Sequence, residues 1–266
     1  MTTATNLEPG RLEAHLRARR DQGRKLLVPY VTGEFDEEWT RTIEAVAAGG
    51  ADAIEIGIPF SDPVMDGPII QAASEQALAR GATPASVIAQ LGDLDVGVPL
   101  VVMTYYNTVF RSGEERFASM LSAHGVSAAI VPDLPLEESG PWCAAADAAE
   151  VETVMLAAPT APDERLVRVT ERSRGFVYGV GLLGVTGERD RLADSAVEIA
   201  ARLTAVTDTP VLIGVGVSTP SQAAEAAAVA DGVVVGSALV RRLLEGCGPE
   251  GAQRFVGELR AGLDQA

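Results

Sequence analysis

The chain has 266 residues, of which 47% are hydrophobic and 22% are charged, a composition typical of a globular protein. Its formal net charge of −16 disfavours nucleic acid and anionic membranes as partners, because both attract basic surfaces. No apolar run approaches the roughly 18 residues of a membrane span, and the polar start lacks a signal-peptide core, so we expect a cytoplasmic protein.

The cysteines and histidines of the chain suggest little chemistry. Cys143 and Cys247 lie far apart without a histidine cluster nearby, which favours two reduced, structurally incidental thiols over a disulfide. His15 and His124 fall in segments of helical character, where we expect them at the surface. A Ser-His-Asp mechanism or a histidine-bound metal therefore has almost no support, and no metal site is predicted.

Strand and helix patterns alternate along the whole chain. Residues 1–10 are expected to form a loose arm before a first helix at Arg11–Arg20. The expected strands are continuous apolar runs rich in Val and Ile, as in a parallel sheet that is buried on both faces. They cover Lys25–Val31, Ala53–Gly57, Pro99–Tyr105, Ala128–Pro132, Glu152–Leu156, Gly175–Val180, Pro210–Gly214 and Gly232–Val235.

Helical patterns lie between these strands. They cover Glu37–Ala48, Ile69–Arg80, Gly113–His124, Glu137–Ala149, Pro162–Arg172, Ala193–Ala205 and Pro220–Ala228. Thr160 and Asp163 are expected to cap the fifth of these helices, and Ser218 and Thr219, followed by Pro220, the seventh.

The number of these units predicts the fold class. Eight strands with intervening helices predict an α/β protein, a single (β/α)8 TIM-barrel domain over residues 1–266 with an N-terminal extra helix. An open, doubly wound sheet is the alternative, because eight βα units also fit that architecture.

The second strand carries the most informative residue of the chain. Glu55 lies inside an apolar run, and the Pro- and Gly-rich loop that follows holds Asp62 and Asp66. Desolvating a carboxylate is costly unless its charge is paired or used. Glu55 is therefore either a salt-bridged residue of the barrel interior or a catalytic acid/base at the carboxyl end of a strand, with a second carboxylate on the next loop.

Three glycine clusters follow the last three strands: Gly184–Gly187, Gly214–Gly216, and Gly236 with Ser237. Glycine lets backbone N–H groups approach an anion closely, and a helix N-terminus adds a favourable dipole. Their joint placement indicates a phosphate site, since such barrels often bind phosphate after strands 7 and 8, although glycine also serves turn geometry alone. The clusters lack a Walker motif and a dinucleotide fingerprint, which disfavours a nucleotide.

These motifs together resemble those of the tryptophan synthase alpha subunit family. The run Glu55-Ile-Gly-Ile-Pro-Phe-Ser-Asp62-Pro, followed by Asp66-Gly-Pro, matches the family at the second strand. Further matches are Val28-Pro-Tyr30-Val-Thr, Met103-Thr-Tyr105-Tyr-Asn107, Pro132-Asp133-Leu-Pro135 and the three glycine clusters. The resemblance covers roughly residues 25–245, with the motifs in order at nearly every strand end.

The resemblance implies a lyase of tryptophan biosynthesis that cleaves indole-3-glycerol phosphate to indole and glyceraldehyde 3-phosphate. It implies that Glu55 and Asp66 are the two catalytic carboxylates and that no cofactor is required. It also implies a PLP-dependent beta subunit in an alpha2beta2 assembly, faced by Asp62 and Asn107. The implied substrate-binding residues are Tyr30, Tyr105, Tyr178 and Thr186, with Gly187, Gly216, Gly236 and Ser237 at the phosphate.

Several departures and alternatives remain open at this point. The first βα loop, Thr32-Gly-Glu-Phe-Asp36, differs from the usual turn of the family, Gly181 stands where many relatives carry Ser, and Met65 replaces a smaller residue. These loops give some reason to consider a standalone indole-producing lyase of a specialised pathway. A non-catalytic activating partner of a beta subunit is disfavoured because both carboxylates are intact. Another phosphate-binding barrel, such as an isomerase, would not explain Asp66.

Single site residues also have plainer interpretations. Each of Tyr30, Tyr105 and Tyr178 could simply fill the barrel, and Thr186 could only cap a turn. Asp62 and Asp133 lie next to prolines and could be ordinary turn residues.

Overall fold

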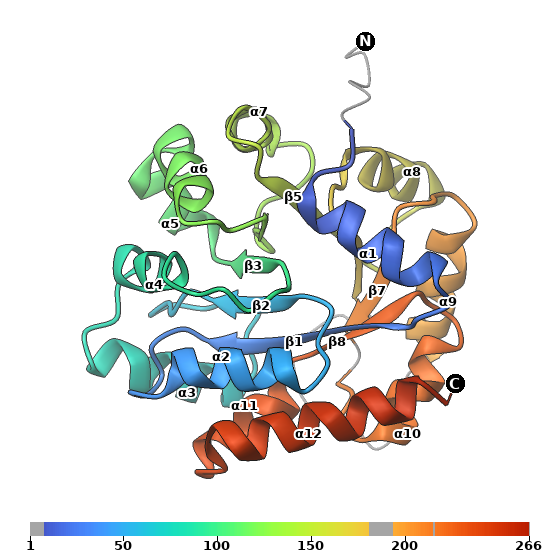
Figure 1. Ribbon diagram of the computed structural model, residues 1–266. Coiled ribbons are helices and arrows are strands. Elements are labelled where there is room, and N and C mark those ends of the chain that lie inside the picture. Colours follow the sequence, from blue (N-terminus) through green and yellow to red (C-terminus); the bar gives the residue numbers. More distant parts are fainter. Residues whose placement is uncertain (1–7, 181–193, 215, 266) are drawn as a thin grey trace.

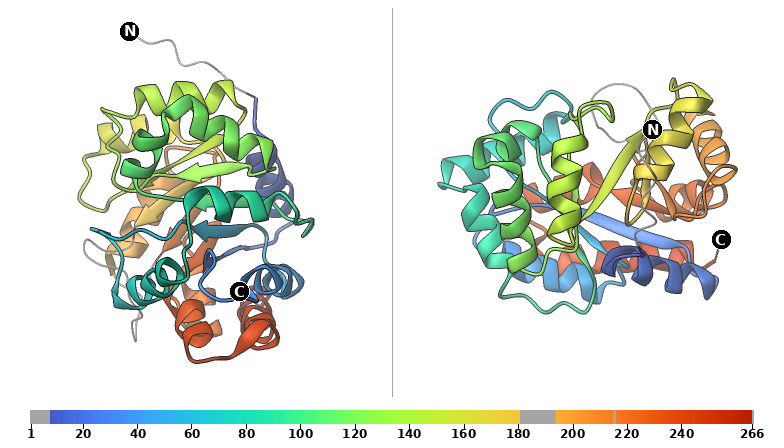
Figure 2. Two further views of the ribbon diagram at one scale, coloured as in Figure 1. Left: turned by 90° about the vertical axis from the view of Figure 1, so that its left-hand side faces the viewer. Right: turned by 90° about the horizontal axis from the view of Figure 1, so that it is seen from above.

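The computed structural model describes residues 8–180, 194–214 and 216–265 of the chain. Eight parallel strands form a closed barrel in sequence order, and helices surround it (Figures 1 and 2). The strands are β1 (Leu26–Thr32), β2 (Ile54–Gly57), β3 (Leu100–Met103), β4 (Ala128–Ile130), β5 (Glu152–Ala157), β6 (Val177–Val180), β7 (Val211–Gly214) and β8 (Gly232–Val235). Because β1 pairs with both β2 and β8, the sheet has no edge; the predicted barrel is confirmed and the doubly wound alternative is wrong.

The described helices include all those expected from the sequence and four more. They are α1 (Arg11–Asp21), α2 (Trp39–Ala48), α3 (Pro68–Ala79), α4 (Pro84–Leu91), α5 (Tyr106–Ser112), α6 (Glu114–Ala123), α7 (Gly140–Ala148), α8 (Asp163–Arg172), α9 (Asp194–Thr204), α10 (Pro220–Ala227), α11 (Ser237–Leu244) and α12 (Gly248–Leu263). The sequence analysis did not identify α4, α5, α11 and α12. The long helix α12 packs against α2 and α10.

One of the two expected helix caps is wrong. Pro162 is the N-cap residue of α8, and its side chain makes no capping hydrogen bond. Asp163 lies in the first turn instead, where its negative charge interacts favourably with the positive end of the helix dipole. At α10 the Thr219 hydroxyl accepts a hydrogen bond from the Gln222 N–H in a capping box, as expected.

The interior of the barrel is filled by alternate residues of its strands. Leu26 and Val28 of β1 pack there with Leu12 and Leu16 of α1, which closes the amino-terminal end of the barrel. Because side chains alternate along a strand, Tyr30 and Glu55 continue the inward-facing rows of β1 and β2 toward the carboxyl-terminal end.

The two cysteines and the two histidines all lie within the part of the chain that the structure describes. Cys143 and Cys247 are both free thiols, as expected. The expected surface position of His15 and His124 is only partly correct, since each is half-buried; burial, with Arg19 nearby, lowers the pKa of His15. Within the described ranges, no helix is long and apolar enough to cross a membrane.

Candidate active site

Glu55 occupies the inner face of β2 without a charged partner. It is 1% exposed, lies opposite Tyr30 of β1 in the strand register, and its Oε2 atom makes no hydrogen bond. Among the described residues, no cation forms an ion pair with it, so the salt-bridge interpretation finds no support. Burial, together with the charge of Asp66, raises the pKa of Glu55 to about 8. The carboxyl is therefore protonated at neutral pH and can act as an acid.

Asp66 is held by the loop between β2 and α3 in a different environment. The Tyr105 hydroxyl accepts a hydrogen bond from the Met65 N–H at 3.1 Å and also bonds the Asp66 carboxylate. Burial raises the pKa of Asp66, whereas the bond from Tyr105 opposes that rise. The structure thus places two carboxyls near each other, one without a hydrogen-bond partner at Oε2 and one that accepts a hydrogen bond from Tyr105.

An aromatic side chain that the sequence analysis did not select lies beside this pair. Phe60 stacks on Tyr105 with a ring separation of 5.0 Å and an interplanar angle of 25°. It lies inside the motif that identified Glu55 and Asp66, so the aromatic residue between these two carboxyls was the available signal. Phe60 and Tyr105 provide a flat apolar surface next to Asp66, suited to a planar ring.

Tyr30 and Tyr178 line the interior from β1 and β6. Both are largely buried, and burial is the main cause that raises the pKa of each phenol above its usual range. The charge of Glu55 contributes to both shifts, which places the two rings around that carboxyl. They are neutral side chains at the mouth of the barrel.

The predicted phosphate turns lie at the ends of β7 and β8. Gly216 has a φ of +74°, a conformation that favours glycine. Gly236 is the N-cap of α11, whose first residue is Ser237. The N–H groups of Leu239 and Val240 bond to the Gly236 carbonyl. Those of Ser237 and Ala238 therefore precede the first helical bond, the position at which a helix N-terminus can bind an anion. Thr186 and Gly187 lie outside the described residues.

The predicted partner residues are exposed at the same end of the barrel. Asp62 lies in the loop after β2 and accepts a hydrogen bond from the Ser61 hydroxyl, and Asn107 lies on α5. Asp133 is more than a turn residue, because its Oδ1 atom accepts a hydrogen bond of 2.8 Å from the Tyr106 N–H at the start of α5. In the part of the chain that the structure describes, no group of three or more His, Cys, Asp or Glu residues is arranged to hold a metal ion.

Comparisons with known proteins identify the family of the chain. Residues 16–260 match the family model described as tryptophan synthase alpha chain. The alpha chain of Thermobifida fusca is 42% identical over 265 residues, which cover 96% of this chain and 98% of that protein. The alpha chain of Gloeobacter violaceus is 45% identical over 250 residues, covering 91% and 89%.

The chain belongs to the tryptophan synthase alpha chain family. A solved structure of Mycobacterium tuberculosis tryptophan synthase superposes with a TM-score of 0.90 at 40% identity, covering 96% of this chain and 99% of that one. The alpha subunit from Legionella pneumophila gives 0.85 at 28% identity, covering 97% and 100%. The predicted family is therefore confirmed, as is the predicted role: an alpha subunit of tryptophan biosynthesis and an indole-3-glycerol phosphate lyase.

Proposed function

We propose that Glu55 and Asp66 carry out the retro-aldol cleavage of indole-3-glycerol phosphate in this chain. The observation that supports this assignment is the buried Glu55 carboxyl, which has an unpartnered Oε2 atom and a pKa raised to about 8, close to an Asp66 that Tyr105 stabilises. Two carboxyls in such unequal surroundings can divide the acid and the electrostatic roles between them.

The steps follow from the chemistry of the indole ring. The unprotonated indole ring is a poor electron sink for carbon–carbon cleavage, so the Glu55 carboxyl first donates its proton to ring carbon C3. Positive charge then develops at the ring nitrogen, whose N–H donates a hydrogen bond to the Asp66 carboxylate. The Glu55 carboxylate next accepts the proton of the adjacent glycerol hydroxyl. The electrons of the O–H bond of that hydroxyl form the C=O bond of the aldehyde. The electrons of the breaking carbon–carbon bond restore the aromatic indole ring.

The phosphate supplies binding energy away from the reacting carbon. Backbone N–H groups of Gly216, Gly236 and Ser237 are proposed to hold it, together with the predicted Gly187, whereas Thr186 is predicted to line the indole end. Binding of the phosphate fixes the position of the glycerol chain next to Glu55, so that the reacting atoms are already in place for the proton transfers. The indole ring would lie against Phe60 and Tyr105, with Tyr30 and Tyr178 beside it around Glu55.

A PLP-dependent beta subunit is the proposed partner, in a cytoplasmic alpha2beta2 assembly. The carboxyl-terminal end of the barrel exposes two large apolar side chains, Val64 at 73% and Phe110 at 65%. They belong to the loop and the helix that also carry Asp62 and Asn107. Apolar side chains rimmed by polar ones are typical of a protein–protein interface.

Release of indole from indole-3-glycerol phosphate by the purified chain tests the catalytic assignment. Glu55→Gln keeps the size of the side chain but removes its acid/base function, so turnover should fall by at least the ~10²–10⁴-fold typical of such a group. Glu225→Gln, an exposed position on α10, is the matched control and should turn over normally. If Glu55→Gln kept more than about a tenth of the wild-type turnover, the assignment would be wrong.

A further inference from the structure

We propose that Tyr30 is a positioning residue for this reaction: its phenol, seated in the space left by Gly57, covers the Glu55 carboxyl and keeps water away from it. The proposal rests on the proposed role of Glu55 as the group that transfers protons. Tyr30 acts through Glu55, by controlling its surroundings.

The phenol of Tyr30 lies unusually close to the backbone of β2. A Cβ atom added at Gly57 would lie 1.8 Å from Oη of Tyr30, 2.4 Å from Cζ and 2.7 Å from Cε2. The end of the ring therefore occupies the space that any other side chain would need. Because Gly57 follows Glu55 by two residues, both face the interior, and the phenol lies at the next inward position toward the mouth of the barrel.

The base of the same side chain is fixed beside the predicted phosphate turn. A Cβ atom added at Gly236 would lie 3.7 Å from Cβ of Tyr30, which is ordinary contact. Tyr30 is 8% exposed and pairs in register with Glu55. The ring thus runs from the end of β8 across β1 to β2, held between two glycines. It lies beside the Glu55 carboxyl and takes up space there that water would otherwise occupy.

The charges around Tyr30 are all negative or neutral. The described groups that act on it are Asp66 from the loop after β2, the Thr32 side chain of β1 through a hydrogen bond, Glu55 from β2 and Tyr105 from the loop after β3. Tyr178 of β6 faces both Tyr30 and Glu55. Burial and the nearby Asp66 raise the pKa of the phenol far above its usual value, so it stays neutral at any working pH. A neutral ring excludes water without adding a counter-charge.

The state of Glu55 is consistent with such a cover. Its Oε2 atom is buried without a hydrogen-bond partner, and burial is the first cause of its raised pKa. If the ring is removed, water can reach the carboxyl and solvate its ionised form. The pKa of Glu55 should then fall toward its ordinary value, and the protonated acid should be lost at a lower pH.

Two substitutions separate the ring from its hydroxyl. Tyr30→Ala removes the cover, whereas Tyr30→Phe keeps the ring and removes only the hydroxyl. The ionisation of Glu55 can be followed by infrared difference spectroscopy of its carboxyl band, with Glu55→Gln as the reference that lacks the band. The pH dependence of turnover is measured in parallel, and melting curves show that each variant is folded.

We expect the midpoint of the Glu55 titration to fall by about one unit or more in Tyr30→Ala and to stay in place in Tyr30→Phe. The alkaline limb of the pH–rate profile should move in the same way. An unchanged midpoint in Tyr30→Ala would overturn the proposal. An equal shift in both variants would also overturn it, because the hydroxyl and not the ring would then be responsible.

The partnership with Gly57 provides a second measurement that is independent of the first. Gly57→Ala should displace the ring of Tyr30 and lower turnover by tenfold or more. The same substitution added to Tyr30→Ala should lower turnover little further, so that the effects of the two substitutions are not additive. Equal losses in both backgrounds would contradict the proposed seat. The infrared titration needs no turnover, so a failure of Glu55 as the catalytic group would appear in Glu55→Gln without affecting this test.

Discussion

The two carboxyls of the site differ because their neighbours differ. Glu55 is surrounded by Tyr30 and Tyr178 and has no partner at Oε2, whereas Asp66 accepts a hydrogen bond from Tyr105. Desolvation favours the neutral form of both carboxyls, but only Asp66 has a hydrogen bond that favours its anionic form. The charge of Asp66 also raises the pKa of Glu55, so Asp66 supports the protonated state that Glu55 needs as an acid.

Asp66→Asn tests this dependence at the level of single residues. Removing a negative neighbour should lower the pKa of Glu55 from about 8, and the loss of the anion beside the ring nitrogen should reduce turnover by roughly 10²–10³-fold. Infrared titration of the Glu55 carboxyl and indole release measure the two effects. Asp93→Asn, at an exposed position between α4 and β3, removes the same charge elsewhere and should change neither.

Glu55 also makes stability depend on pH. Its pKa in the folded chain, about 8, lies above the value of 4.5 expected when it is unfolded. The folded state therefore binds the proton more tightly, and this contribution to stability is complete below pH 4.5 and lost as the pH rises through 8. The free energy of unfolding of Glu55→Gln, relative to that of the wild type, should consequently be larger at pH 9 than at pH 5. Urea unfolding of both proteins at the two pH values measures this difference. A constant difference across this range would show that Glu55 ionises normally.

At the scale of single elements, the N-terminus of α11 can be probed at Gly236. A side chain there meets only Tyr30 at ordinary contact distance and the φ is not positive, whereas a side chain at Gly216 would be strained by its φ of +74°. Gly236→Asp should therefore fold and should weaken substrate binding strongly by opposing the phosphate charge, while indole alone still binds. Gly236→Asn has nearly the same shape without the charge and should lose much less affinity. Equal losses in the two variants, measured as KM, would argue against a phosphate at this turn.

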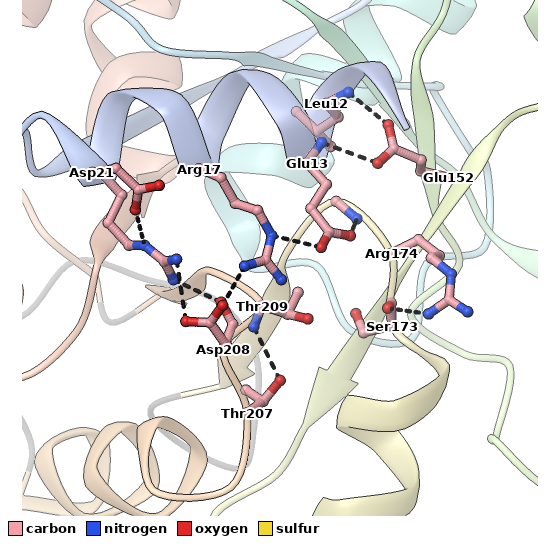
Figure 3. A network of polar contacts seen from close by, with 12 residues as sticks. Leu12, Glu13, Arg17, Asp21, Glu152, Ser173, Arg174, Thr207, Asp208 and Thr209 are labelled. Atoms are coloured by element: carbon pink, nitrogen blue, oxygen red, sulfur yellow. Dashed lines mark hydrogen bonds and ion pairs between the residues drawn. The ribbon is translucent and has the colours of Figure 1, made fainter. Parts of the chain in front are cut away.

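The helix α1 is held at the opposite end of the barrel by a buried carboxylate from β5 (Figure 3). Glu152 is 6% exposed and accepts hydrogen bonds from the N–H groups of Leu12 at 2.6 Å and Glu13 at 3.0 Å. Its side chain approaches so closely that a Cβ atom at Gly10 would lie 2.5 Å from Cδ. Glu13 in turn accepts a bond from Arg17, which also pairs with Asp208. Glu152 thus acts as a helix cap supplied from a distant part of the chain.

Glu152→Ala should lower the free energy of unfolding by about 1–3 kcal/mol, because two buried N–H groups lose their acceptor. Burial raises the pKa of Glu152 to about 7 although the two N–H bonds oppose the rise. Its protonation therefore favours the folded state below pH 4.5 and this contribution is lost as the pH rises through 7. Glu152→Gln should remove this pH dependence. Urea unfolding at pH 5 and pH 8 measures both effects, with Glu225→Ala as the exposed control; no change in Glu152→Ala would contradict the capping role.

At the scale of the whole molecule, the proposed catalytic residues and the proposed partner surface share one end of the barrel. The carboxyl ends of all eight strands open there, and the exposed Val64 and Phe110 lie on segments that also reach Asp66 and Tyr105. A subunit that docks on this end could order the loops around the substrate and exclude water, so that part of the catalytic rate depends on docking.

Phe110→Ser should therefore reduce activation of the chain by a beta subunit and leave turnover of the isolated chain nearly unchanged. Val206→Ser, which removes another exposed apolar side chain just beyond α9, is the control and should leave activation intact. Indole release is measured with increasing concentrations of beta subunit. A chain that turns over at its full rate alone and does not respond to the beta subunit would be the standalone lyase considered from the sequence.

The sequence by itself determined the order of strands and helices, the position of Glu55 within a strand, and the family. These depend on local patterns: apolar runs, the motif from Glu55 to Asp66, and glycines after strands. The helices α11 and α12 were missed, although the glycine and serine that begin α11 were selected as phosphate ligands. Both helices lie after the last predicted strand, where the βα alternation gives no further strand to mark their ends.

Only the tertiary structure decided whether the sheet closes, whether Glu55 has a salt-bridge partner, and where the phenol of Tyr30 ends. The contact between Glu152 and α1 joins residues 140 positions apart, and the stacking of Phe60 on Tyr105 joins two loops. The pKa of Glu55 depends in the same way on side chains from other strands. Burial, charge and steric contact act through space, and a sequence pattern describes only neighbours along the chain.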